Sequence, residues 1–155
     1  MQKKENRVFL DSNVILSGFL SDRGSPCIIL DLFSLGMPHI HGATGQYNII
    51  EIERNLTKKA PEMAGIYKEF FPLLNLEIIP LPAYEEIRKL SGHTRDKDLP
   101  VLASAINYDA AFLVTGDKKD FLLKGMKGKF GFKILSPSEF LEEILPEILK
   151  NTGEE

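Results

Sequence analysis

Near its N-terminus the chain contains the stretch RVFLD (Arg7–Asp11), a short apolar run that ends in an acidic residue. Such a run is typical of a strand that is buried in a parallel sheet and leaves it at the carboxyl edge. Ligands of open α/β sheets bind beyond that edge. The stretch therefore predicts the first strand of an α/β domain, with Asp11 beside a ligand crevice.

Four further short segments with strand-like composition follow, at 38–42, 76–80, 111–115 and 132–135. Amphipathic or capped segments separate them and predict helices at 14–20, 27–35, 44–59, 62–74, 84–90, 100–108 and 140–150. The last helix follows Ser136-Pro137-Ser138-Glu139, which has the residues of a capping box. Because strands alternate with helices, we expect a parallel sheet of about five strands in a single α/β/α domain over residues 1–155, with its core at about 7–141.

The composition limits the possible partners and cellular compartments. The 155 residues include 19 basic and 22 acidic side chains, so the net charge of −3 gives no global attraction to polyanions and any nucleic-acid contact must be local. The single cysteine, Cys27, excludes an internal disulfide and a cysteine-rich zinc module. No apolar run approaches the roughly 18 residues of a membrane span. We expect a cytoplasmic protein that makes no membrane contact.

Acidic residues gather at the predicted carboxyl edge. Asp11 ends the first strand and Asp117 follows the fourth, which would be its neighbour in a doubly wound sheet. Asp98 precedes the helix that leads into the fourth strand, and Glu51 lies within the helix after the second. Carboxylates held together raise one another's pKa unless a cation is present. Ligation by oxygen alone suits Mg²⁺ or Mn²⁺, which can promote phosphodiester hydrolysis.

Four motifs resemble, in order and spacing, those of the PIN-domain nucleases: VFLDSNV at 8–14, EIERNL at 51–56, DLPVLA at 98–103 and LVTGDKKD at 113–120. The resemblance extends over about 7–141. Its final part, LSPSEFL at 135–141, is similar to the ending of stand-alone prokaryotic members, many of which are VapC-type toxins.

This resemblance implies a metal-dependent endoribonuclease that acts on single-stranded or structured RNA, with an antitoxin protein as partner and a homodimeric assembly. It implies that the catalytic metal ligands are Asp11, Glu51, Asp98 and Asp117, with Asp120 as a fifth carboxylate. Asn13 would support Asp11, and the Thr115 hydroxyl would orient Asp117. The sequence departs from the family pattern at Ser12, where threonine is commoner, and at Gln46 and Tyr47, where a small hydroxyl residue is frequent.

Two surfaces follow from the local composition. Between Lys118 and Lys133 six lysines accompany one acid, and we expect RNA phosphates to bind Lys118, Lys119, Lys124, Lys127 and Lys129. Solvated loop lysines are the simpler interpretation of the same run. Apolar residues of the short helices, including Phe70, Phe71 and Leu74, are candidates for a dimer surface.

Other functions were weighed against the nuclease. A PIN fold without chemistry, acting as an RNA-binding or protein-binding module, would be marked by the loss of an aspartate, yet Asp11, Asp98 and Asp117 are all present. A signalling receiver domain needs an aspartate at the end of the third strand, where this chain has Pro80. A haloacid-type phosphatase needs a second aspartate two residues after the first, where this chain has Asn13.

Overall fold

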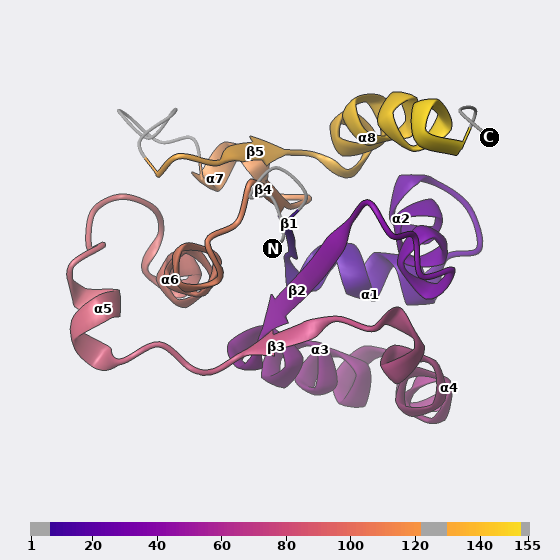
Figure 1. Ribbon diagram of the computed structural model, residues 1–155. Helices are drawn as coiled ribbons and strands as arrows, with labels where there is room; N and C mark the ends of the chain where they lie inside the picture. Colours follow the sequence, from indigo (N-terminus) through magenta and orange to yellow (C-terminus); the bar gives the residue numbers. More distant parts are fainter. Residues whose placement is uncertain (1–6, 122–129, 153–155) are drawn as a thin grey trace.

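The computed structural model describes residues 7–121 and 130–152. Its strands form one parallel sheet in the order β3-β2-β1-β4-β5 (Figure 1). They are β1 (Arg7–Leu10), β2 (His41–Gly45), β3 (Glu77–Ile79), β4 (Phe112–Val114) and β5 (Lys133–Leu135). The prediction of a parallel α/β sheet is therefore confirmed, and β1 lies at its centre with β4 as a direct neighbour.

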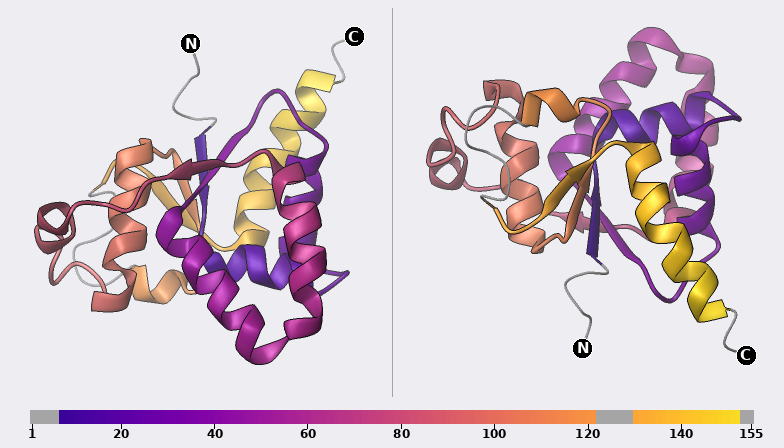
Figure 2. Two further views of the ribbon diagram at one scale, coloured as in Figure 1. Left: turned by 90° about the horizontal axis from the view of Figure 1, so that it is seen from below. Right: turned by 90° about the horizontal axis from the view of Figure 1, so that it is seen from above.

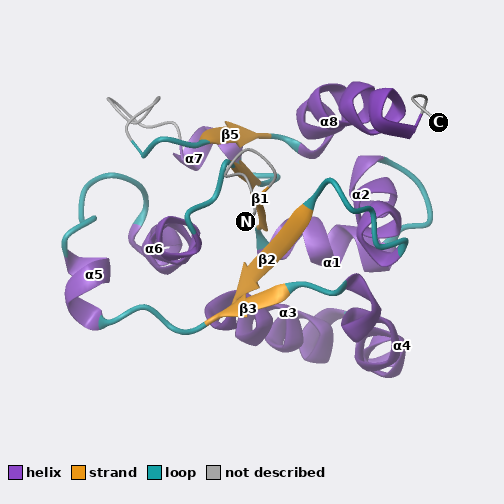
Figure 3. Ribbon diagram, viewed as in Figure 1, coloured by secondary structure: helices purple, strands orange, loops and turns teal. Residues whose placement is uncertain are grey.

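Helices cover both faces of this sheet (Figures 1 and 3). One face carries α1 (Ser12–Leu20), α2 (Ser25–Ser34), α3 (Gln46–Lys59), α4 (Ala64–Phe70) and α8 (Pro137–Thr152). The other side carries α5 (Tyr84–Arg88), α6 (Leu99–Tyr108) and α7 (Lys118–Phe121). Figure 2 shows the same arrangement from below and from above the view of Figure 1. In the part of the chain that the structure describes, no helix combines the length and hydropathy that crossing a membrane requires.

The alternation of side chains along β1 explains why its sequence is continuously apolar. Val8 and Leu10 enter the core under α1 to α4 and α8, whereas Phe9 enters the core under α6. All three side chains are fully buried. A strand that contributes to two cores needs apolar residues at every position, and this fixes Asp11 at the first position outside the sheet.

The second strand was predicted at 38–42, but β2 lies three residues further along the chain, at His41–Gly45. Its sequence, HGATG, lacks a bulky apolar run for a steric reason. A Cβ on Gly42 would lie 2.5 Å from a ring carbon of Phe33, so the helix packs directly on the strand backbone. Strands made of such small residues give a weak sequence signal.

The predicted helix at 62–74 is divided into three parts: a 3-10 turn at Pro61–Met63, α4, and a second 3-10 turn at Phe71–Leu74. Pro72 has no backbone N–H to continue the α-helical pattern, which accounts for the second break. The capping box before α8 is confirmed. Ser136 N donates to Glu139 Oε1 at 2.9 Å, and Glu139 N donates to Ser136 Oγ at 3.2 Å.

Candidate functional site

Asp11 is the centre of the candidate site, at the point where β1 ends and α1 begins. Its residue is 5% exposed, and its carboxylate accepts three hydrogen bonds. Ser12 N and Asn48 Nδ2 donate to Oδ1 at 2.7 and 3.1 Å, and Thr115 Oγ1 donates to Oδ2 at 2.7 Å. Burial raises the pKa of Asp11 from 3.8 to about 7, the bonds from Thr115 and Ser12 lower it, and the charges of Glu51 and Asp98 raise it again. The carboxylates of Asp11, Glu51 and Asp98 are thus electrostatically coupled.

Asp117 is linked to Asp11 through Thr115, the residue that follows β4. The Thr115 hydroxyl donates to Asp11 and accepts from the backbone N–H of Asp117 at 3.0 Å. In the described residues the Asn13 side chain bonds to the loop after β4, whereas the family resemblance implied that it supports Asp11. Its Nδ2 donates to Asp117 Oδ2 at 2.9 Å, and its Oδ1 accepts from Gly116 N at 2.9 Å. Because α1 starts directly at Ser12, the Asn13 side chain is directed across the edge of the sheet toward the β4 loop.

Glu51 is held by residues that the sequence analysis did not select. Ser12 Oγ donates to Glu51 Oε1 at 2.9 Å, and Asn48 Nδ2 donates to Ser12 Oγ at 2.8 Å as well as to Asp11. Asn48 is fully buried, and its Oδ1 accepts from Gly45 N at 3.2 Å. Its position three residues before Glu51, on the same helix face, is a sequence signal that could have identified it.

Tyr47, a departure from the family pattern, connects two parts of the site. Its hydroxyl donates to the backbone oxygen of Lys97 at 3.0 Å, so α3 is tied to the turn that carries Asp98. Burial raises the pKa of Tyr47, and the charges of Glu51 and Asp98 add to this increase. The tyrosine therefore lies between the two acidic segments and does not displace Glu51 from the site.

Asp98 and Asp120 are joined by Arg95. Asp98 ends the 3-10 turn Asp96–Asp98 and is 8% exposed, and its side chain makes no capping bond to α6. Arg95 Nε lies 3.4 Å from Asp98 Oδ2, and Arg95 Nη2 lies 2.6 Å from Asp120 Oδ2. Burial raises the pKa of Asp98, while the hydrogen bond and charge of Arg95 lower it.

The donor set of this edge has the chemistry of a hard-cation site, since its acids supply only oxygen atoms and one of them is buried with a raised pKa. In the described residues, however, no three carboxylate, histidine or cysteine side chains converge closely enough to hold an ion. Asn13 holds Asp117, Ser12 holds Glu51, and Arg95 holds Asp98 and Asp120. The residue types suit Mg²⁺ or Mn²⁺. Hydrogen bonds and the positive charge of Arg95 maintain their arrangement in this structure.

The predicted RNA-binding lysines are only partly described. Lys118 Nζ lies 2.8 and 2.9 Å from the two carboxylate oxygens of Glu139, so this ammonium group is paired within the protein. The Lys118 contact lowers the pKa of Glu139 to about 2. Lys119 is exposed on α7. Lys124, Lys127 and Lys129 lie outside the described residues.

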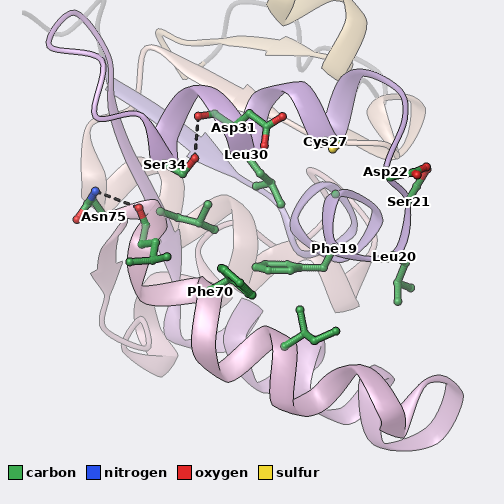
Figure 4. A pocket seen from close by; sticks show the side chains of 14 residues that line it. Phe19, Leu20, Ser21, Asp22, Cys27, Leu30, Asp31, Ser34, Phe70 and Asn75 are labelled. Carbon is green, nitrogen blue, oxygen red and sulfur yellow. Dashed lines mark hydrogen bonds between the residues drawn. The ribbon is translucent and has the colours of Figure 1, made fainter.

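An apolar pocket of about 950 Å³ lies between α1, α2 and the segment from α4 to Asn75 (Figure 4). Phe19, Leu30 and Phe70 meet in the pocket, and Leu73 and Leu74 contribute to its wall. The prediction that Phe70, Phe71 and Leu74 together form an exposed surface is wrong in part. Leu74 is only 4% exposed, Phe71 packs against Tyr67 with ring centroids 5.2 Å apart, and Phe70 remains 45% exposed.

Comparisons with known proteins agree with this fold. A family model described as a PIN domain matches residues 7–119. A similar solved structure is that of VapBC2 from Rickettsia felis bound to a DNA fragment from their promoter. The matched chain is 22% identical, the match covers 84% of this chain and 98% of that chain, and the TM-score is 0.61, which establishes likeness of fold. No curated protein matches the sequence. Because the family model covers most of the chain and includes Asp11, Glu51, Asp98 and Asp117, this chain belongs to the PIN-domain family.

Proposed function

We propose that this protein is a divalent-metal-dependent endoribonuclease of the VapC type, acting as the toxin of a toxin–antitoxin pair. The observation that carries the proposal is the environment of Asp11. Three donors hold its buried carboxylate in one orientation, while the charges of Glu51 and Asp98 act on it. A structural aspartate has no need of two acidic neighbours, whereas a cation ligand does.

Each part of the polar network has a function in this proposal. Asp11, Glu51, Asp98 and Asp117 would hold the ion, with Asp120 as a fifth carboxylate. Thr115 fixes Asp11 and the backbone of Asp117 at the same time, so the ends of β1 and β4 present their acids together. Ser12 and Asn13 orient Glu51 and Asp117.

A bound Mg²⁺ or Mn²⁺ would supply charge neutralisation and the activation of water for in-line displacement at phosphorus. The protein contributes orientation. The buried Asp11 keeps one carboxylate away from bulk water, and the exposed Asp117 faces the side from which a nucleic acid arrives. Exposed Lys119, on α7 two residues after Asp117, adds a positive charge for the phosphate backbone.

Cleavage of a fluorescently labelled single-stranded RNA tests the proposal. We expect cleavage with Mg²⁺ or Mn²⁺ and none with EDTA. Asp11→Asn and Asp117→Asn should each lower the rate more than about a hundredfold, because even residues that only contact metal ligands contribute about 10- to 100-fold. Glu53→Gln is the matched control, since Glu53 is an exposed acid on the same helix as Glu51. Cleavage that persists in EDTA, or in both aspartate variants, would contradict the proposal.

The antitoxin partner is proposed to bind the apolar pocket with an apolar segment of its chain. Leu20, Ile66, Phe70 and Leu73 line this pocket and are each between 44% and 53% exposed. An exposed apolar surface of this kind is unusual in a monomer and typical of an interaction site. The likeness to VapBC2 supports a protein partner as its occupant.

A further inference from the structure

Arg95 is placed between two of the proposed metal ligands. It precedes the turn that carries Asp98, and its guanidinium contacts Oδ2 of Asp98 through Nε and Oδ2 of Asp120 through Nη2. The side chains of Asp98 and Asp120 are 12% and 28% exposed, whereas that of Arg95 is 46% exposed. The guanidinium therefore lies on the solvent side of the two acids, where an entering ion or substrate would meet it first.

The charge of Arg95 stabilises this arrangement. Asp98 and Asp120 are both acidic and repel one another, and the Arg95 guanidinium lies 3.4 Å from a carboxylate oxygen of Asp98 and 2.6 Å from one of Asp120. Arginine thus supplies the positive charge that the acids need in the absence of a metal ion. The same oxygen atoms cannot bind the guanidinium and a divalent cation together without strong repulsion between the two cations.

A guanidinium binds carboxylates and phosphates through the same planar set of N–H donors. An arginine released from Asp98 and Asp120 can therefore bind a phosphate group of the substrate, because the substrate of a nuclease brings phosphates to this site. Its long side chain can change partner by rotation about its own bonds, and half of it already faces solvent.

We propose that Arg95 is the internal counter-ion of the acidic site, that binding of the divalent cation releases it from Asp98 and Asp120, and that it then binds a phosphate of the RNA. This inference rests on the proposed function. It assigns Arg95 two successive partners and predicts that the residue opposes metal binding while it favours RNA binding.

Titration calorimetry with Mn²⁺ alone, without RNA, measures the first part. Arg95→Gln should bind Mn²⁺ about tenfold more tightly than the wild type, because the ion no longer has to displace a charge-assisted contact from the two acids. Lys97→Gln is the matched control. Lys97 acts on Asp98 only through its charge, and no contact of its side chain with either acid is recorded. If the loss of one positive charge near the acids were the whole effect, the two variants would bind Mn²⁺ with equal affinity.

Cleavage kinetics at saturating Mn²⁺ measure the second part. Arg95→Gln should raise KM for single-stranded RNA about tenfold, as expected for the loss of one charge-assisted contact, and Lys97→Gln should raise it much less. Thermal unfolding verifies that both variants are folded, which is expected because both side chains are exposed. Tighter Mn²⁺ binding together with a higher KM supports the proposal, and failure of either change relative to Lys97→Gln overturns it.

These outcomes separate the inference from the function on which it rests. If the wild type has no Mn²⁺ site that Asp11→Asn removes, the proposed function fails and the inference fails with it. If that site is present and RNA is cleaved, but Arg95→Gln behaves like Lys97→Gln, only the inference fails.

Discussion

The burial of Asp11 makes the stability of the metal-free protein depend on pH in an unusual direction. Unfolded, this carboxyl ionises with its ordinary pKa of 3.8, and in the fold its pKa is about 7, mainly because of burial. Between those values the folded state binds a proton that the unfolded state has lost, so stability falls as pH rises from about 4 to about 7. A pKa difference of about 3 units corresponds to about 4 kcal/mol at pH 8.

Asp11→Asn removes the free-energy cost of a buried ionised carboxylate and introduces a smaller cost from one lost hydrogen bond. A carboxamide keeps one acceptor oxygen for Ser12 N and Asn48 Nδ2, but its nitrogen then faces Thr115 Oγ1, which loses the acceptor for its proton. One mismatched bond costs about 1 kcal/mol. We therefore expect the variant to be more stable than the wild type by about 3 kcal/mol at pH 8 and to gain nothing near pH 4.

Urea unfolding in EDTA, at pH values from 4 to 8, tests this expectation. The free energy of unfolding of the wild type should decline relative to that of Asp11→Asn across this range, and Asp22→Asn, at an exposed aspartate, should follow the wild type. Mg²⁺ at a hundred times its Kd should restore roughly 2.7 kcal/mol to the wild type at pH 8 and much less to Asp11→Asn. Parallel pH profiles for the wild type and Asp11→Asn would refute the reasoning about burial.

Four smaller predictions follow from the packing. Asn48→Leu removes the bonds to Asp11 and Ser12 and should destabilise the fold by about 2 kcal/mol and weaken Mn²⁺ binding in calorimetry; unchanged Mn²⁺ affinity would contradict its role in the site. Ser136→Ala should lower the free energy of unfolding by about 1 kcal/mol through loss of the capping box, and an unchanged urea midpoint would argue against that cap. Leu73→Asp should abolish binding of the antitoxin in a pull-down with the co-expressed neighbour gene product while leaving RNA cleavage unchanged; full retention of the partner would remove the pocket from the interface. The protein should be a homodimer by light scattering at micromolar concentration, and a monomeric mass would reject that assembly.

The sequence predicts those parts of the fold whose local pattern and tertiary environment agree. The run Arg7–Asp11 and the Ser136–Glu139 capping box are such cases, since burial on both faces and side-chain capping leave direct residue signatures. The strand β2 was misplaced because close packing of Phe33 requires glycine at position 42, so the strand lacks a bulky apolar run. Local secondary-structure propensity does not depend on such contacts between distant segments, so it cannot predict them.

The same distinction applies to the site. Asp11 and Asp117 could be selected from the sequence because strand ends in a parallel sheet face one edge, whereas Glu51 in a helix and Asp98 in a turn were selected with the support of the family resemblance. The partners of the acids could not be selected from the sequence, since Asn13 and Arg95 reach residues that only the tertiary fold brings near them. Asn48 is an intermediate case, because its spacing from Glu51 places it on the side of the helix that carries the site, but the helix pattern does not show whether its amide is buried or solvated.

The bond between Thr115 and Asp11 spans 104 residues of chain, and this separation affects the order of events during synthesis. The central strand β1 leaves the ribosome well before its neighbour β4 and the attached Thr115 and Asp117. Until then β1 lacks one of its pairing partners, and closing so long a loop makes its docking a late step of folding. A nascent chain that has not yet exposed β4 and Asp117 therefore cannot assemble the site, and the proposed cutting activity arises only after these residues have been synthesised.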